Sequence, residues 1–150
     1  MFSRTTEYAL RATVWLAQRH PEPQTTQEIA EVGQIPVGYL SKVMQALGRA
    51  GLVQASRGLH GGFTLLKGPD RMTVLEVINA VDPIRRIQEC PLKLAAHGLF
   101  LCPLHKRLDD ALATIEGAFG KTTLAELIGP DAAVQPLCNT NWTASAGARL

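Results

Sequence analysis

Short helical patterns, each broken by proline or glycine, are the feature that most constrains how the first third of this chain folds. Apolar residues recur at helical spacing over residues 5–19, and the two prolines that follow cannot continue that helix. Two further helical patterns lie at residues 25–32 and 36–50. The pattern therefore predicts three short helices in succession, separated by turns.

The ends of the second and third helices carry their own signals. Thr25 and Glu28 form a capping-box pattern, in which each side chain can bond the other residue's backbone N–H, and Gly33 is expected to close this helix. Pro36 suits the first position of the third helix, and Gly51 is expected to end it. The expected apolar stripe of the third helix consists of Leu40, Val43, Met44 and Leu47.

A glycine-rich turn follows the third helix. Residues 52–56 and 63–67 are short extended runs, and residues 57–62 join them, which predicts a β-hairpin. Three short helices followed by a hairpin is the order of a winged helix-turn-helix. The fold class we expect is therefore mainly α with a small β-hairpin wing. In that fold the third helix enters the major groove of DNA, and the wing lies along the flanking backbone.

The second half of the chain contains one long helical pattern. A short helix capped by Thr73 and Glu76 is expected to end near Pro83, and another is expected after Thr123. Between them, residues 103–119 carry an apolar stripe wide enough to need a partner surface. That stripe consists of Leu104, Leu108, Ala111, Leu112, Ile115, Ala118 and Phe119.

Composition excludes several classes of protein. The chain has 150 residues, of which 46% are hydrophobic and 19% charged, and this fits one globular domain rather than a disordered chain. No apolar run approaches the roughly 18 residues of a membrane span, and Arg4, Glu7 and Arg11 interrupt any signal-peptide core. Three cysteines do not make a disulfide framework. We therefore expect a cytoplasmic protein that has no membrane partner.

The charged residues are unevenly distributed, although the formal net charge is only +2. No acidic residue lies between Glu31 and Asp70, whereas several basic residues do, and a surface free of negative charge suits phosphate contact. The N-terminal residues of a helix in the major groove reach base edges. The start of the third helix and the hairpin tip are therefore the candidate DNA contacts. These candidates are Pro36, Gly38, Tyr39, Ser41, Lys42, Arg57, His60 and Gly61.

Two of these candidates, Arg57 and Tyr39, also have an interpretation that involves no contact with DNA. Arg57 is the strongest candidate for a minor-groove or phosphate contact, and its alternative is a solvated charge on the hairpin. For Tyr39, a half-buried position at a helix start is as good an interpretation as contact with DNA.

Residues 90–105 hold two of the three cysteines and two of the four histidines. They are Cys90, His97, Cys102 and His105, with a Cys-x6-His-x4-Cys-x2-His spacing that is not that of a zinc finger. Thiolate and imidazole are ligands suited to iron–sulfur clusters, zinc or copper. The residues alone leave two interpretations open: a metal site, or cysteines that are ordinary small core residues.

Many segments of the chain resemble the Rrf-type winged-helix regulators, a family that includes IscR, NsrR and CymR relatives. The resemblance covers residues 1 to 128, and its strength lies in the number of segments in register. The segments are Thr6-Glu7-Tyr8-Ala9-Leu10-Arg11, Ile29-Ala30, Ile35-Pro36-Val37-Gly38-Tyr39-Leu40, Leu47-Gly48-Arg49-Ala50-Gly51-Leu52-Val53, Arg57-Gly58, Gly61-Gly62-Phe63 and Thr73-Val74-Leu75-Glu76-Val77-Ile78. The resemblance implies a homodimeric transcription factor, usually a repressor, that binds an imperfect palindrome in double-stranded DNA.

The resemblance also implies a division of the chain into four parts. Residues 1–82 are expected to form the winged helix-turn-helix DNA-binding domain, and residues 83–102 a sensor loop. Residues 103–128 are expected to form a helix that pairs with its counterpart in the other subunit, followed by a short helix. The remaining residues, 129–150, are rich in Ala, Pro, Asn, Thr and Gly, which predicts a largely flexible tail.

The family's base and phosphate contacts carry over onto the start of the third helix and the wing arginine. Tyr39, Ser41 and Arg57 match those places. Some members with an iron–sulfur cluster have a glutamate where this chain has Ser41. This difference bears on the target sequence and not on the mode of binding.

A mixed-ligand [2Fe–2S] cluster is the cofactor that the resemblance implies. Cluster-binding members place their cysteines just before the dimer helix; Cys90 and Cys102 match the outer pair, and His105 matches a histidine of the IscR-like branch. Ala96 stands where the middle cysteine would be, so ligation by cysteine alone is excluded. A mixed site that includes His97 or His105 stays open, as does the absence of a cluster.

An acidic residue in the first helix of the partner subunit completes the cluster in some relatives, and Glu7 occupies that position. Its alternative is an ordinary acid favoured by the helix dipole. Our hypothesis is that gain, loss or redox change of the cluster shifts the loop and the dimer helix, and with them the two recognition helices. Cys138 lies in the expected tail and is left out of the site.

Three rival interpretations remain. The first is a cluster-free regulator that responds through thiol chemistry at Cys90 and Cys102 or through a small ligand. The second is an enzyme with Cys90 or Cys102 as nucleophile and His105 as base, although the sequence has neither an acyl-transfer motif nor a phosphate loop, so we expect no enzyme. The third is a protein-interaction module that does not bind DNA.

Overall fold

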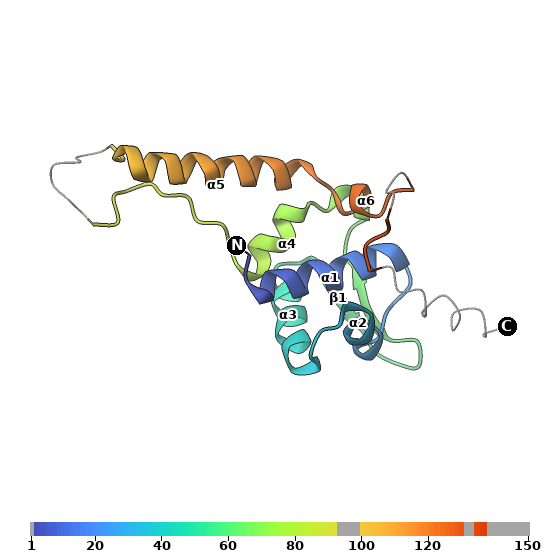
Figure 1. Cartoon of the computed structure of the whole chain (residues 1–150). Coiled ribbons are helices and arrows are strands. Elements are labelled where there is room, and N and C mark those ends of the chain that lie inside the picture. Colours follow the sequence, from blue (N-terminus) through green and yellow to red (C-terminus); the bar gives the residue numbers. More distant parts are fainter. Residues whose placement is uncertain (1, 93–99, 131–133, 138–150) are drawn as a thin grey trace.

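The computed structural model describes residues 2–92, 100–130 and 134–137. Within that part of the chain, helices pack around α1, and one short two-stranded sheet lies at the side of these helices (Figure 1). In chain order the elements are α1 (Arg4–Arg19), α2 (Thr26–Gly33), α3 (Val37–Arg49), β1 (Val53–Ser56), β2 (Gly62–Leu65), a 3-10 turn (Pro69–Arg71), α4 (Val74–Val81), α5 (Pro103–Lys121) and α6 (Leu124–Leu127). The predicted fold class, mainly α with a small hairpin wing, is confirmed.

Helix starts follow the predicted capping boxes. In each box the threonine hydroxyl accepts a hydrogen bond from the glutamate N–H, and the glutamate carboxylate accepts one from the threonine N–H. The boxes are Thr25 with Glu28, Thr73 with Glu76, and Thr123 with Glu126.

Two helix ends differ from the prediction. Gly33 is the buried last residue of α2, and Gln34 takes the left-handed conformation with a φ of 51°. The Gln34 N–H then donates to the carbonyls at the end of α2, which satisfies the helix end without a glycine. Pro36 is the N-cap of α3 rather than its first residue.

Helix α1 lies at the centre of the core and contacts α2, α3, α4 and α6 (Figure 1). Its Leu16 is only 1% exposed because helices pack around it on several sides. The predicted stripe of α3 is fully buried against this core: Leu40, Val43, Met44 and Leu47. Burial of that stripe turns the opposite face of α3 to the outside.

The hairpin is anchored to the helical core at its base. Strands β1 and β2 pair antiparallel, with Val53 opposite Leu65 and Ser56 opposite Gly62. Two backbone hydrogen bonds, of 3.0 and 2.8 Å, connect Gln24 and Phe63 and so attach the hairpin to the segment before α2. The tip of the hairpin is therefore the part that projects.

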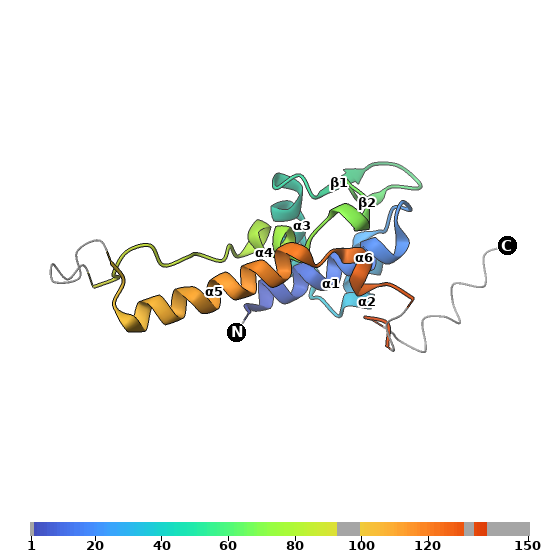
Figure 2. The same ribbon diagram turned by 90° about the horizontal axis from the view of Figure 1, so that it is seen from above.

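Helix α5 is arranged differently from the other helices. Its C-terminal end packs on the core, where Phe119 meets Phe2 with 5.5 Å between ring centroids. Its N-terminal half extends beyond the core, and the described residues that follow α4, 82–92, run along the same side (Figures 1 and 2). Leu104, Leu108 and Ile115 of the predicted stripe are 64%, 48% and 36% exposed. The described residues therefore leave these three side chains of the stripe largely uncovered, whereas Phe119 is covered by the core.

The residues that follow α5 return to the core. Leu124 of α6 is fully buried, although the sequence grouped α6 with the long helix. The side-chain amide of Gln18 donates to the carbonyl of Pro136 at 2.9 Å, and Leu137 packs against the core. Residues 134–137 are thus held in place where we expected a flexible tail; residues 131–133 and 138–150 lie outside the described part. No helix within the described residues is long and apolar enough to cross a membrane.

Candidate nucleic-acid interface and metal-ligand segment

The outward face of α3 presents small and polar side chains. Gly38, Ser41, Lys42 and Gln45 are all exposed, because the apolar stripe faces the core. The Ser41 hydroxyl donates to the Val37 carbonyl at 3.3 Å, a weak bond that a competing acceptor can replace. A methyl group built on Gly38 would meet no atom within 4 Å, so the surface there is open to a partner.

Tyr39 is both exposed and in contact with α1. Its side chain is 52% exposed, and its ring meets that of Tyr8 edge to face, with 5.8 Å between centroids. Arg11 in turn lies 5.9 Å from the centroid of Tyr8. The two interpretations of Tyr39 are therefore compatible: one edge of the ring is supported by α1, and the rest faces outward.

The wing tip is a tight turn closed by glycines. The Gly61 N–H donates to the Gly58 carbonyl at 3.0 Å, and Gly58 has a φ of 109°, which side chains rarely allow. The turn presents Leu59 and His60 outward, with Leu59 95% exposed and Arg57 exposed beside them. The structure thus places the predicted wing residues together at one projecting tip.

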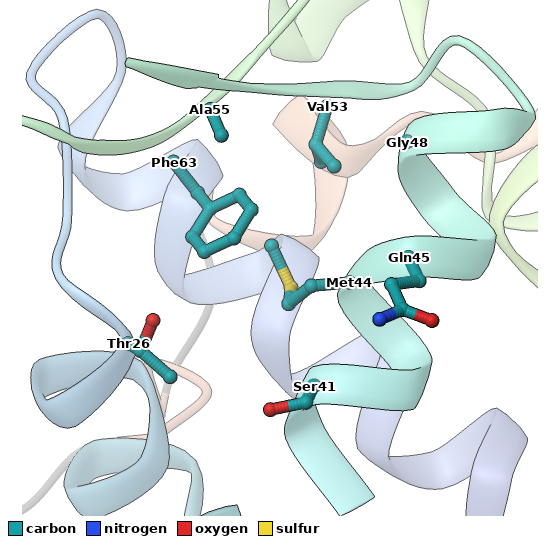
Figure 3. A pocket seen from close by; sticks show the side chains of 8 residues that line it. All are labelled: Thr26, Ser41, Met44, Gln45, Gly48, Val53, Ala55 and Phe63. Carbon is teal, nitrogen blue, oxygen red and sulfur yellow. The ribbon is translucent and has the colours of Figure 1, made fainter. Parts of the chain in front are cut away.

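A pocket of about 370 Å³ lies between α3 and the hairpin (Figure 3). Met44 and Phe63 form its apolar floor, and neutral polar side chains from α2 and α3 line its edge. These edge residues are Thr26, Ser41 and Gln45. None of the eight lining residues is charged.

Thr26 and Gln45 were missed as candidate site residues. Gln45 follows Ser41 by one helical turn and lies off the apolar stripe, so the spacing was a usable signal. Thr26 reaches the pocket only because α2 packs beside α3, which no local pattern reveals.

The exposed basic residues of α3 and the wing are Lys42, Arg49 and Arg57. The acid-free stretch also contains Lys67, but its ammonium group pairs with Glu76 of α4. Because Lys67 has a carboxylate partner, its charge is partly neutralised and it contributes less to an anion-binding surface than the sequence suggests.

Two of the metal-ligand candidates, Cys102 and His105, lie in contact within the described residues. Cys102 is the N-cap of α5, and its Sγ lies 3.3 Å from Nδ1 of His105, which confirms that the two share a helix face. Cys90 and Cys102 are partly exposed, and neither forms a disulfide. His97 and Cys138 lie outside the described residues.

This pair suits two ligands of one metal ion. Metal–sulfur and metal–nitrogen bonds of tetrahedral sites place neighbouring donor atoms about 3.5 Å apart. The described residues contain no group of three or more His, Cys, Asp or Glu side chains that could hold a metal ion. The chemistry of this pair fits two ligands of a mixed site, and the described residues do not bring a third donor to it.

Glu7 is engaged with its own helix. It lies in the first turn of α1, and its carboxylate pairs with Arg11 at 3.0 Å. Arg11 also donates to the Gly33 carbonyl at 3.3 Å. Since the Glu7 side chain is 54% exposed, it is open to a second subunit, whereas it joins no donor group within the described chain.

An ion-pair cluster that the sequence did not predict joins the segment after α4 to α5. Arg86 donates to both oxygens of Asp109, at 2.7 and 2.6 Å, and to Glu116 at 3.4 Å. The Ile87 N–H donates to the same Asp109 carboxylate at 2.9 Å. These donors, Arg86 foremost, lower the pKa of Asp109 to about 2. Asp109 is therefore charged throughout the physiological pH range.

Comparisons with known proteins agree on one family. The sequence model of the Rrf2 family, "Iron-dependent Transcriptional regulator", matches residues 2–130. A protein of Aquifex aeolicus is 33% identical over 131 residues, covering 85% of this chain and 91% of that protein. The HTH-type transcriptional regulator NsrR of Geobacillus kaustophilus is 31% identical, with 88% of this chain and 92% of that protein covered.

A solved structure extends the likeness to three dimensions. The global cysteine regulator CymR of B. subtilis superposes with a TM-score of 0.70 at 25% identity, covering 85% of this chain and 95% of that chain. The family match spans the winged helix-turn-helix, the cysteine segment and the long helix together. The chain therefore belongs to the Rrf2 family of transcriptional regulators.

Proposed function

We propose that this regulator binds a palindromic DNA site as a homodimer, acts as a repressor, and senses redox, iron or nitrosative state through a mixed-ligand [2Fe–2S] cluster. The observation that carries the DNA-binding part is the outward face of α3 beside the projecting wing, with no acidic residue between Glu31 and Asp70. Such a surface meets phosphates without repulsion.

Each part of this surface suits a different part of the duplex. Ser41, Lys42 and Gln45 project from α3, which has the dimensions that the major groove admits. Arg57 and His60 lie at the wing tip, where they would follow the flanking backbone or minor groove. The DNA strand between the two grooves then passes over the pocket, whose neutral edge residues can donate to it.

A salt-dependent DNA titration tests this part. The full-length protein should bind promoter fragments at low ionic strength, with log affinity falling linearly against log salt concentration. Lys42→Ala should reduce the slope by about 1, whereas the matched variant Lys121→Ala, at the far end of α5, should leave it unchanged. A protein that ignores DNA at low salt, with or without iron, would refute the proposal.

The exposed stripe of α5 supports the homodimer. Leu104 and Leu108 lie outward on the half of the helix that extends beyond the core, where a second copy of the same helix can cover them. A pair of such helices would present two α3 helices to one palindromic site.

Cys90, Cys102, His105 and His97, with Glu7 of the partner subunit, are the proposed cluster ligands. When bound, such a cluster would supply a centre whose charge and stability respond to oxidants, iron and nitric oxide. Cys102 and His105 are on the first turn of α5, so a change in their arrangement acts directly on the helix we assign to the dimer.

Anaerobic purification followed by visible absorption and by iron and sulfide analysis tests the cluster. Coloured protein containing both elements is expected, and Cys90→Ala and Cys102→Ala should each lose them. The thiol variant Cys138→Ser is the matched control and should retain them. A colourless protein with neither element, even after reconstitution, would leave only DNA binding and would favour a regulator that responds through its thiols.

A further inference from the structure

We infer that Arg86 and Asp109 form a register clamp, a contact that fixes the segment after α4 along α5 so that Cys90 lies level with Cys102 and His105. This inference rests on the proposed function, because it concerns how the proposed ligands come together. Arg86 and Asp109 are positioning residues in this account and do not touch the metal themselves.

The clamp is built from an unusually complete set of hydrogen bonds. Asp109 is the single buried residue of α5, a helix on which Leu104 and Leu108 are exposed. Its carboxylate accepts two N–H groups from Arg86 and one from the Ile87 backbone. A planar guanidinium bound to both carboxylate oxygens fixes orientation as well as distance. The contact therefore sets one alignment of the two segments.

Distances along the two segments explain what the alignment achieves. From the clamp, the segment toward Cys90 and the helix toward Cys102 run to the same end of α5 (Figure 1). The four residues from Arg86 to Cys90 span at most about 13 Å, and the chain bends at Glu89 within that stretch. Seven helical residues from Asp109 back to Cys102 span about 10.5 Å. The clamp therefore limits how far Cys90 can lie from the level of Cys102 along the helix.

Every proposed ligand of this segment lies within the loop that the clamp closes. Residues 86–109 include all four: Cys90, His97, Cys102 and His105. Closing a loop in advance lowers the entropy that its side chains lose when they meet. The clamp would therefore raise the effective concentration of Cys90 toward the pair formed by Cys102 and His105.

The effective concentration of the two thiols can be measured without any metal. Apoprotein carrying Cys138→Ser is equilibrated with reduced and oxidised glutathione. When the thiols of Cys90 and Cys102 form a disulfide, one oxidised glutathione is reduced to two thiols. Mass spectrometry of alkylated samples then gives the equilibrium constant, which is the effective concentration of the pair.

Five variants distinguish a contact that aligns the segment after α4 with α5 from a contact that only stabilises the fold. Arg86→Ala and Asp109→Ala remove the clamp and should lower the effective concentration about tenfold. The reversed pair Arg86→Asp with Asp109→Arg should restore it. Asp109→Ala with Ala113→Asp keeps a carboxylate but moves it about 6 Å along the helix. This double variant should not restore the effective concentration. Asp110→Asn removes the neighbouring exposed ion pair with Lys106 and should change nothing.

The outcomes decide between the two roles. An unchanged effective concentration in both single variants would overturn the clamp. If the shifted carboxylate fully restored the effective concentration, any ion pair between this segment and α5 would suffice. That result would overturn the alignment role. Far-UV circular dichroism checks that each variant is folded, and the reversed pair remains decisive if a single variant is not.

A second measurement separates this inference from the proposed cluster. Visible circular dichroism of the reconstituted protein should change in Asp109→Ala and not in Asp110→Asn. If the wild-type protein takes up no iron, the cluster proposal fails while the thiol measurement still decides on the clamp. If the wild-type protein holds a cluster and Asp109→Ala holds it with the same spectrum and lifetime, the clamp does not position the ligands.

Discussion

The core around α1 and the projecting half of α5 differ in which side chains they bury. In the core, the buried side chains are nearly all apolar, such as Leu16, and the few buried polar ones on α1 are the uncharged Thr6 and Thr13. In α5, Leu104 and Leu108 are exposed, and the single buried residue is Asp109, which carries a charged carboxylate. The core is therefore complete in one chain. The projecting helix is held by polar contacts to its own chain, and its apolar surface is left for a partner.

The largest difference between these regions should appear on truncating a leucine in each. Leu16→Ala should lower the free energy of unfolding by about 2–5 kcal/mol, because it leaves a cavity in a closely packed core. Leu104→Ala should change it by less than about 0.5 kcal/mol, because that side chain is already exposed. Urea unfolding at protein concentrations where the monomer prevails measures both values. Equal losses would contradict the comparison.

The exposed stripe of α5 should matter for association instead. Leu108→Ala removes one leucine from each side of a symmetric interface, and at about 1.5 kcal/mol per side chain the dimer dissociation constant should rise about a hundredfold. Sedimentation equilibrium measures this constant. Leu59→Ala at the wing tip is the matched control, since that leucine is exposed but distant from α5. A dimer indifferent to Leu108→Ala would place the interface elsewhere.

DNA binding should depend on charge in the wing and not on charge in α5. Arg57→Ala should weaken binding about tenfold and reduce the salt slope by about 1, because one phosphate contact is lost. Arg107→Ala, an exposed charge on α5, should leave both values unchanged. Fluorescence anisotropy over a series of salt concentrations measures them. Equal effects would mean that only the net charge attracts DNA.

The smallest effect that we expect is that of low pH on the contact between Arg86 and Asp109. The pKa of Asp109 is lowered to about 2 by Arg86, the Ile87 N–H and the nearby charge of Lys106, while Glu116 shares Arg86. A carboxyl group whose pKa falls on folding contributes stability above its unfolded pKa of about 3.9, and this stability is lost as pH falls toward 2. The attachment of residues 84–92 to α5 should thus be constant from pH 5 to 8.

Hydrogen exchange of the peptide that contains Ile87 measures this attachment. Protection of that peptide, corrected for intrinsic exchange rates, should fall only below about pH 4 in the wild-type protein, and should be lower at every pH in Asp109→Ala. A loss of protection near pH 6 would instead assign the control of this segment to a histidine.

The parts of the fold that were predictable are those fixed by neighbouring residues. Capping boxes act over three residues and the α3 stripe over about four, so Thr25 with Glu28, and Leu40 with Met44, were readable directly. The contact between Cys102 and His105 follows from helical spacing in the same way. The Rrf2 family and its winged helix-turn-helix were recognised from segments of this kind.

The parts that could not be predicted depend on distant residues. Gln34 takes a left-handed conformation without being a glycine, and Leu124 enters a core begun more than a hundred residues earlier. Thr26 lines the pocket only because two helices pack side by side. Each of these depends on where another element lies.

The sequence by itself determined the elements of this protein, an acid-free stretch suited to DNA, and a cluster of thiols and imidazoles before a long helix. Only the tertiary structure decided that Arg86 reaches Asp109 across 23 positions of sequence, and that the described residues leave Leu104 and Leu108 exposed. The physical reason is the distance in sequence over which each interaction acts. Periodicity and capping act within one helical turn, whereas an ion pair between separate segments forms only once packing has brought them together.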